Sequence, residues 1–310
     1  MILLMDMGTS NTRLFLFDGQ RVLDTEKGSF GAGSTLAEGR TFLETGVRSL
    51  IGTILARNNL SETDISHIVA SGMASSELGI AEVPHLAAPT TLCDLVNGME
   101  TVKVESITEI PFCIVPGVRK NNENGEIEDM MRGEETETFG ICDLMGIEKN
   151  AVLVLPGSHN KVLALDENGA ISDFVTCMSG ELMSAVSGHT ILRGAVSYDY
   201  NLDEGALCEG AAFAKDNGLG AALFRVRVLT KRQGANADKI SSFFSGAVLS
   251  SDAELAKEYA REGRTVYVGG KASLRHALAI LIGGSVQELP DEVSASAVSH
   301  GLSLICKKMK

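Results

Sequence analysis

The chain of 310 residues carries 27 Lys and Arg against 40 Asp and Glu, which gives a formal net charge of −13. Hydrophobic residues make up 44% of the sequence and charged residues 22%, a composition typical of a folded α/β protein rather than a disordered or collagen-like chain. Because so negative a surface repels phosphate backbones and anionic lipids, the charge argues against nucleic-acid and membrane partners.

The cysteines and the first residues bear on the cellular compartment. The 6 cysteines are spread singly and form no C-x-x-C pair, a pattern typical of buried free thiols in a reducing cytosol. The start of the chain, MILLMDMGTS, is apolar only briefly, and no apolar run approaches the roughly 18 residues that a membrane helix needs. The sequence therefore favours a cytoplasmic protein without a signal peptide.

A strand-turn-strand pattern begins the chain and returns near its middle. Apolar residues 2–5 and 14–17 flank a polar turn, and an Asp-Gly turn leads to a third strand at 21–23. Residues 152–155, 162–165 and 170–172 repeat this order about half a chain later, a spacing far longer than that of a solenoid repeat. The aligned turns are Gly8-Thr9-Ser10-Asn11, followed by Arg13, and Gly157-Ser158-His159-Asn160, followed by Lys161.

Helical periodicity follows each hairpin. Apolar residues between 42 and 55 share one helix face and precede a strand at 65–70; in the second half a helix begins at Ser179. A late strand at 265–268 ends at Gly269-Gly270 and passes into another helix. The alternation predicts an α/β fold with a mixed sheet in each half. We place the boundary in the polar region between residues 121 and 150 and divide the chain into domains 1–130 and 131–310.

The two turns offer groups that bind phosphate. Backbone N–H groups, hydroxyls and a cation within one turn suit a phosphate, although a single Gly-Thr-Ser segment is commonly an ordinary hairpin turn. Two copies at equivalent places favour phosphate binding. Asp6 ends a buried strand, where an isolated carboxylate is costly, so we expect Mg²⁺, held largely through water, as the compensating group. Gly269-Gly270 is either a tight turn or a backbone against which a nucleoside lies, and its order in the chain favours the nucleoside.

The hexapeptide MRGEET at residues 131–136 opens another predicted helix. Carboxylates in a first helical turn interact favourably with the helix dipole, so an ordinary acidic first turn is the alternative interpretation. Arg132, beside Gly133, is placed so that its guanidinium can bind a carboxylate through two hydrogen bonds. For His159 we expect hydrogen-bond donation or packing rather than proton transfer. The absence of G-x-S-x-G, G-x-G-x-x-G and Walker A motifs disfavours acyl transfer and the usual Rossmann and P-loop sites.

These blocks together resemble the actin, Hsp70 and sugar-kinase superfamily, which implies two duplicated ribonuclease H-like domains with a nucleotide cleft between them. Within it the chain resembles the 2-dehydro-3-deoxygalactonokinases. The resemblance implies ATP-dependent phosphorylation of the C6 hydroxyl of a 2-keto-3-deoxy sugar acid, with 2-dehydro-3-deoxy-D-galactonate expected. It also implies a sugar-acid and phosphate-loop domain at 1–130 and a nucleotide-binding domain at 131–310. The ordered motifs are DMGTSNTR (6–13), SGM (71–73), MRGEET (131–136), LPGSHNK (155–161), MSGEL (178–182) and LFRVR (223–227).

The resemblance assigns a role to each matching residue. Glu134, or else Glu135, would accept the hydroxyl proton, and Asp6 would hold Mg²⁺ through water. Arg132 would bind the substrate carboxylate or orient the loop. The remaining contacts to the sugar acid would come from Gly72, Met73, Ser76 and Glu135. The ATP contacts would come from Gly8, Thr9, Ser10, Asn11, Arg13, Gly157, Ser158, His159 and Lys161, with Gly269 and Gly270 beside the adenosine.

The chain departs from the family at several aromatic positions. Met7 and Val162 stand where the family often has Trp, Ile80 replaces another, and the chain has 0 Trp. We expect these changes to alter the shape of the sugar pocket more than the phosphate chemistry. The alternatives are a kinase of another sugar or sugar acid, a nucleotide-dependent binding or sensor protein, and a degenerate kinase that binds the acid without turnover. The C4 configuration of the substrate, the nucleotide preference and a homodimeric assembly stay open.

Overall fold

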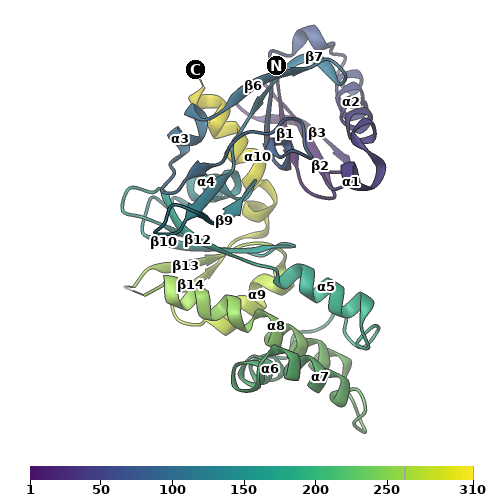
Figure 1. The fold of residues 1–310 in the computed structure, drawn as a ribbon, viewed down its shortest axis with the longest axis vertical. Helices are drawn as coiled ribbons and strands as arrows, with labels where there is room; N and C mark the ends of the chain where they lie inside the picture. The colour runs from purple at the N-terminus through teal and green to yellow at the C-terminus, as the bar shows by residue number, and fades with distance from the viewer. Residues whose placement is uncertain (262, 310) are drawn as a thin grey trace. The chain divides into compact units, whose positions relative to one another are not determined.

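The computed structural model describes residues 1–261 and 263–309, and the chain folds into two compact units (Figure 1). Unit 1 comprises Met1–Lys149, Glu167–Asp173 and the stretch from Ala295 onward. Unit 2 comprises Asn150–Asp166 and Phe174–Ser294. Each unit has its own sheet and its own hydrophobic core, so each is described by itself.

Unit 1 is built on a 6-stranded sheet of order β3-β2-β1-β4-β7-β6. The central strand β1 pairs antiparallel with β2 and parallel with β4. Helix α2 (Arg40–Arg57) buries Leu43 and Val47 against Leu3 and Met5 on one face of this sheet. The strands are β1 (Ile2–Met7), β2 (Thr12–Phe17), β3 (Val22–Gly28), β4 (Ile68–Gly72), β6 (Glu100–Val104) and β7 (Thr108–Ile114).

Unit 2 repeats this arrangement with a 5-stranded sheet of order β12-β11-β10-β13-β14. Its central strand β10 pairs antiparallel with β11 and parallel with β13, as β1 does with β2 and β4. The predicted duplication of an α/β unit is therefore confirmed. The strands are β10 (Ala151–Leu155), β11 (Asn160–Leu165), β12 (Ile171–Cys177), β13 (Thr265–Val268) and β14 (Val286–Glu288).

Helices supply most of the core of unit 2. Phe243 and Val248 of α8 and Leu278 of α9 pack with Val152 and Val154 of the central strand. Figure 1 shows α6 and α7 beside α8. The helices are α5 (Ser179–His189), α6 (Glu204–Asn217), α7 (Leu219–Leu229), α8 (Ala237–Tyr259) and α9 (Ala272–Ile282).

A small 3-stranded sheet, β5-β8-β9, belongs to unit 1 and was not predicted from the sequence. It comprises β5 (Leu86–Ala87), β8 (Val118–Asn121) and β9 (Ile127–Met131), and it lies immediately before helix α4 (Glu134–Met145). The other elements of unit 1 are the short helices α1 (Ser34–Glu38), η1 (Glu62–Asp64), η2 (Met73–Ser75) and α3 (Leu92–Asn97). Helix α10 (Asp291–Lys308) ends the described chain.

The division of the chain differs from the one that the sequence suggested at residues 130 and 131. Helix α4 stays in unit 1 because it packs closely against α10: a Cβ on Gly140 would lie 1.9 Å from the carbonyl oxygen of Ala297. A Cβ on Gly301 would likewise lie 2.0 Å from the carbonyl oxygen of Thr136. The polar residues that suggested a linker form the β8-β9 hairpin instead.

The positions where the family often has Trp lie in the cores. Met7 is 0% exposed and Ile80 is 2% exposed in the core of unit 1, and Val162 is 0% exposed in that of unit 2. The expectation that these residues shape a sugar pocket is therefore wrong, because they contribute to core packing. The cysteines are free, but Cys93 and Cys208 are exposed rather than buried. In the described ranges, no helix has the length and apolar character needed to cross a membrane.

Candidate functional site

Backbone hydrogen bonds from the glycine-rich segment 31–33 hold the first predicted phosphate turn, Gly8–Asn11. The amide of Ala32 donates to the Gly8 carbonyl at 3.0 Å, and that of Gly33 donates to the Thr9 carbonyl at 2.9 Å. A Cβ on Gly31 would lie 2.3 Å from the Gly8 oxygen, so only glycine allows this approach. Thr9, Ser10 and Asn11 remain exposed.

Asp6 and Arg13, which lie opposite each other on β1 and β2, form an ion pair. The Arg13 Nε and Nη2 atoms lie 2.8 Å and 2.6 Å from the Oδ2 atom of Asp6. Arg13 therefore compensates the charge of the partly buried carboxylate. Because both contacts use Oδ2, Oδ1 accepts no hydrogen bond from the described residues, and one oxygen stays available for water.

Two glycines bring the end of β4 close to the start of α4. Gly72 has φ 73° and Gly133 has φ 106°, both in the region that disfavours side chains. A Cβ on Gly133 would lie 3.2 Å from the Cα atom of Gly72, and one on Gly72 would lie 2.5 Å from the Met7 carbonyl oxygen. The first turn of α4 thus lies beside the ends of β1 and β4, where Asp6 is located.

Arg132 holds the segment that follows β4. Its Nη1 atom donates to the carbonyl and hydroxyl oxygens of Ser75 at 2.6 Å and 2.7 Å and to the Val83 carbonyl at 3.3 Å. Its Nη2 atom lies 3.4 Å from Nδ1 of His85. The Arg132 guanidinium therefore orients the loop that contains Ser75 and Val83. This is the second of the two roles that the sequence left open for Arg132. Ser76, a predicted substrate contact, is 7% exposed and donates to the Met73 carbonyl at 2.8 Å.

The carboxylates of α4 occupy different environments. Glu135 is 0% exposed, and both its oxygens accept the Gly133 amide at 2.8 Å. Burial, with a contribution from Glu134, raises the pKa of Glu135 to about 8. This carboxyl closes the helix start and is not accessible to a sugar acid, contrary to the expected substrate contact. Glu134 is only partly buried.

Glu137 is a further carboxyl at this place that sequence reasoning missed. Burial, Glu134 and Asp6 raise the pKa of Glu137 to about 7, and Arg13 opposes the rise. Its position one helical turn after Glu134 is a sequence signal that could have found it, because residues three apart share a helix face. The carboxyls of Asp6, Glu134, Glu135 and Glu137 therefore interact at the start of α4, together with the Arg13 guanidinium.

The second predicted phosphate turn, in unit 2, is held by side chains. Oδ1 of Asn160 accepts the Gly157 amide at 2.9 Å, and its Nδ2 atom donates to Oδ2 of Asp252 at 2.7 Å. The Ser179 hydroxyl donates to Oδ1 of the same carboxylate, also at 2.7 Å. Asp252, 0% exposed on α8, therefore fixes both the turn and the start of α5.

Helix α5 begins directly against this turn. A Cβ on Gly180 would lie 1.9 Å from the Gly157 carbonyl oxygen, and the Glu181 amide donates to the Ser158 carbonyl at 2.8 Å. Nε2 of His159 lies 2.9 Å from Oε2 of Glu181 in an exposed pair. Lys161, expected to bind phosphate, is 3% exposed within β11, and the amide of Gly157 is already bonded to Asn160. The turn therefore presents the exposed Ser158 rather than a lysine.

The Gly-Gly step after β13 lies beside the same turn. Gly270 has φ 80°, and a Cβ there would lie 3.0 Å from the carbonyl oxygen of Pro156, the residue before Gly157. Nη1 of Arg275 donates to the Gly270 carbonyl at 3.1 Å. The structure thus brings together the second turn and Gly269-Gly270, which are more than a hundred residues apart in the sequence.

The comparison with known families agrees with this organisation. The model of the family described as 2-keto-3-deoxy-galactonokinase matches residues 6–305, which includes both turns and the start of α4. The chain belongs to this family. A curated member, the probable 2-dehydro-3-deoxygalactonokinase DgoK1 of Rhizobium meliloti, is 30% identical over 194 residues. That match spans 62% of this chain and 58% of the relative.

Solved structures show which fold this 2-keto-3-deoxy-galactonokinase family member has. A Sinorhizobium meliloti protein assigned to the 2-dehydro-3-deoxygalactonokinases superposes with a TM-score of 0.80 at 24% identity, covering 100% of this chain and 99% of its own. The activator of 2-hydroxyisocaproyl-CoA dehydratase from Clostridium difficile, solved with ADPNP, gives 0.54 at 13% identity, covering 99% and 95%. The predicted actin-like ATPase and sugar-kinase fold is therefore confirmed.

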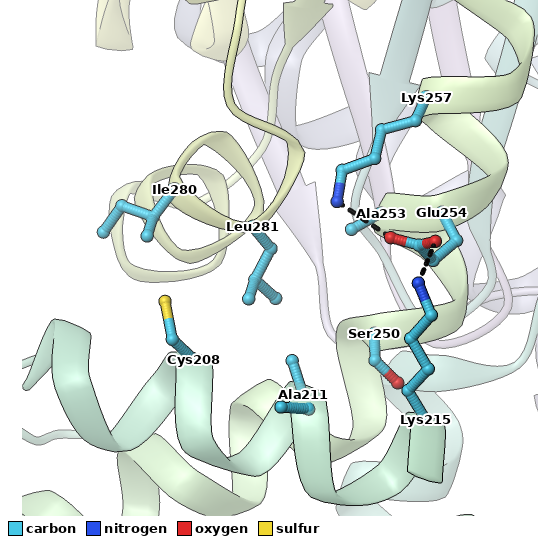
Figure 2. Close-up of a pocket in the computed structure, with 10 residues that line it drawn as sticks. Cys208, Ala211, Lys215, Ser250, Ala253, Glu254, Lys257, Ile280 and Leu281 are labelled. Carbon is cyan, nitrogen blue, oxygen red and sulfur yellow. Dashed lines mark hydrogen bonds and ion pairs between the residues drawn. The ribbon is translucent and has the colours of Figure 1, made fainter.

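A pocket of about 210 Å³ in unit 2 contains none of the predicted site residues. It lies between α6, α8 and α9, and Figure 2 shows Lys215 and Lys257 converging on Glu254. The two ammonium groups lie 2.9 Å and 2.8 Å from its carboxylate oxygens and lower the pKa of Glu254 to about 2. Both lysines of this pocket are thus engaged by the one carboxylate of Glu254, which leaves the three groups with a net charge of +1.

A magnesium ion would have to be held mainly by water and phosphate. Among the described residues no group of three His, Cys, Asp or Glu has the spacing of a metal site. Asp6, with Oδ1 turned away from Arg13, suits a single water-mediated contact to Mg²⁺, which prefers oxygen ligands and keeps several waters. The residues therefore fit the ion in the manner expected from the sequence.

Proposed function

We propose that the chain transfers the γ-phosphoryl group of ATP to the C6 hydroxyl of a 2-keto-3-deoxy sugar acid, with 2-dehydro-3-deoxy-D-galactonate as the expected substrate. The family match over residues 6–305 carries this proposal. The expected compartment is the cytoplasm, and the expected partner is a small molecule. Phosphoryl transfer requires alignment and charge neutralisation more than covalent chemistry from the protein, and the described site supplies groups of these kinds.

The nucleotide contacts are assigned to the two turns. In unit 1 the exposed Thr9, Ser10 and Asn11 would donate hydrogen bonds to phosphate oxygens. In unit 2 the exposed Ser158 would do so from a turn that Asp252 already holds in place, whereas the Gly157 amide is already bonded to Asn160. The rigid support lowers the entropic cost of ordering these donors when phosphate binds. Gly269-Gly270 would lie against the nucleoside.

Glu134 is assigned as the proton acceptor. The C6 oxygen bonds to the γ-phosphorus as the bond from that phosphorus to the β,γ-bridging oxygen breaks, and the hydroxyl proton passes to the Glu134 carboxylate. ADP leaves with the electron pair of the broken bond. Glu134 suits this role better than Glu135, because Glu135 is fully buried and bonded to Gly133. Bound Mg²⁺ would neutralise phosphate charge during the transfer.

A coupled assay of ADP release tests the proposal. Purified protein is incubated with ATP, Mg²⁺ and a panel of 2-keto-3-deoxy acids, the corresponding free sugars and a no-acceptor control. We expect acceptor-dependent ADP release with the acids and a 6-phosphate product by mass spectrometry. Turnover with free sugars alone would overturn the substrate class. ATP and acid binding without ADP release would instead favour the degenerate kinase.

A further inference from the structure

One face of the small β5-β8-β9 sheet collects two arginines and a histidine. Along β8, Arg119 and Asn121 project to the same side, because alternate residues of a strand share a face. Arg119 is paired with Ala87 of β5 and with Met130 of β9. His85 and Arg132, two residues before Ala87 and two after Met130, extend the same side. We name this surface, formed by His85, Arg119, Asn121 and Arg132, the arginine face.

Gly117 allows the two ends of the arginine face to meet. A Cβ at this position would lie 2.8 Å from Cδ2 of His85 and 2.9 Å from Cγ of Arg132. Without that atom, Nη2 of Arg132 reaches Nδ1 of His85 at 3.4 Å. Since a guanidinium can only donate, Nδ1 accepts and the imidazole proton lies on Nε2. His85 thus presents a neutral N–H donor, in keeping with the lowering of its pKa to about 4 by burial and the two arginines.

Several polar atoms of this face lack partners. Nε2 of His85, Nε of Arg119 and Oδ1 of Asn121 are buried and form no hydrogen bond with the described residues. The Arg119 side chain makes no ion pair in the described part of the chain, although the protein has a net charge of −13. Buried polar atoms without partners destabilise a fold, so their concentration on one small sheet points to a polar ligand that this face binds.

On the opposite side of β8 the cation Lys120 is paired with acidic residues. Nζ of Lys120 lies 2.8 Å from Asp173 and 3.4 Å from Glu128, and Val118 is 0% exposed. The two sides of one strand therefore differ in their charge balance. The arginine face is also open at its middle, where Ala87 is exposed and Met130 is 49% exposed on either side of Arg119.

We propose that the arginine face binds the carboxylate end of the substrate, with Arg119 as the main contact. A guanidinium offers a donor fork that matches a carboxylate, His85 adds a neutral donor, and the Asn121 carbonyl can accept from a substrate hydroxyl. The inference rests on the proposed function and moves carboxylate recognition from Arg132 to Arg119. Strand β9 leads from this face through Arg132 to Glu134. The substrate carboxylate and the reacting hydroxyl would therefore be recognised at different places.

The test compares an acid with its neutral amide. Steady-state kinetics are measured for the wild type and for Arg119→Gln, with the 2-keto-3-deoxy acid that gives most turnover and with its C1 primary amide. We expect kcat/KM for the acid to fall about 10- to 100-fold, the loss typical of a charged hydrogen bond. The values for the amide and the KM for ATP should hardly change. Lys120→Gln, on the opposite side of the same strand, is the matched control and should leave both acceptors unaffected.

The outcomes separate this inference from the proposed function. If Arg119→Gln keeps the wild-type preference for acid over amide, the inference is wrong while the kinase activity stands. Should the wild type release no ADP, equilibrium binding of the acid to the wild type and to Arg119→Gln decides the inference alone: equal affinities would overturn it. If Arg119→Gln does not fold by circular dichroism, Arg119→Lys replaces it, with a weakened but retained acid preference expected.

Discussion

The two predicted phosphate turns each join the central strand of a sheet to its antiparallel neighbour, yet they are supported by different chemistry. In unit 1 backbone amides of Ala32 and Gly33 hold the turn, and the charged pair of Asp6 and Arg13 lies beside it. In unit 2 neutral donors, Asn160 and Ser179, hold the turn through the single buried carboxylate of Asp252. Duplication has preserved the position of the turn but not the groups around it.

From this difference we infer that the start of α4 in unit 1 and the turn in unit 2 have different roles. Burial raises the pKa values of Glu135 and Glu137 at the start of α4 to about 8 and about 7, and carboxyls perturbed in this way are typical of proton-transfer sites. A turn of fixed amides and hydroxyls suits a phosphate that must bind and leave. We therefore expect substitutions of the carboxyls at the start of α4 to lower kcat and substitutions that displace either turn to raise the KM for ATP.

The largest effect is expected from Glu134→Gln. Loss of a general base typically costs 10²- to 10⁴-fold, so we expect kcat to fall by about that factor while ATP affinity is retained. A coupled assay of ADP release measures kcat, and an equilibrium binding experiment with ATP measures the affinity. Glu137→Gln is the discriminating partner variant: if it, and not Glu134→Gln, abolishes turnover, the base has been assigned to the wrong carboxyl of α4.

Crowding the turns by one methyl group compares the two units directly. In Gly180→Ala the new Cβ would lie 1.9 Å from the Gly157 oxygen, and in Gly31→Ala it would lie 2.3 Å from the Gly8 oxygen. Overpacking against backbone costs about 1–3 kcal/mol, and the displaced turn should raise the KM for ATP about tenfold in each case.

The chain supplies a control for each glycine. Gly188→Ala on α5 and Gly52→Ala on α2 place the methyl group where nothing lies within 4 Å. Both should leave kinetics unchanged and maintain or raise the melting temperature, since Ala favours helix. Equal KM values for Gly180→Ala and Gly188→Ala would show that the unit 2 turn does not bind nucleotide.

Asp252→Ala removes the support of the unit 2 turn. Leaving Asn160 and Ser179 without their acceptor should lower the free energy of unfolding by about 1–3 kcal/mol, measured by urea denaturation. We expect the KM for ATP to rise and kcat to change less, because Asp252 positions the turn without touching substrate. A loss of kcat at unchanged KM would contradict this role.

The smallest effect is expected at the pocket between α6, α8 and α9. Glu254 has its pKa lowered from 4.5 to about 2 by Lys257 and Lys215, so these ion pairs stabilise the fold above about pH 4.5. That stabilisation is lost as the pH falls through about 2. Because the carboxylate is 45% exposed and screened by water, Glu254→Gln should cost under about 1 kcal/mol at neutral pH. An increase in the KM for ATP would mean that this pocket takes part in nucleotide binding.

Much of the fold could be predicted because it is encoded locally. Strand alternation and the Asp-Gly turn predicted β1, β2 and β3, and the same pattern predicted β10, β11 and β12. Helices α2, α5 and α9 followed from apolar spacing. The β8-β9 hairpin was missed because its short strands, VRKN and IEDMM, show no regular alternation of apolar and polar residues, and the turn between them is polar like a linker.

The candidate site was predictable in its motifs but not in its contacts. Residue types and order pointed to the two turns and to the start of α4. The partners came from elsewhere in the chain: Asp252 lies 92 residues from Asn160, and Arg132 lies 57 from Ser75. One signal for Asp252 exists, since it falls among the buried residues Leu249, Ala253 and Ala256 on the apolar side of α8, where a carboxylate requires a partner.

The sequence by itself determined the duplicated strand order and the motifs of the family, because turns and periodic patterns depend on neighbouring residues. Only the tertiary structure decided which charged groups are already paired, as Arg13 is with Asp6, and which are left without partners, as Arg119 is among the described residues. Pairing depends on which strands and helices pack together across long stretches of chain. The energy of each charge is therefore set by the fold.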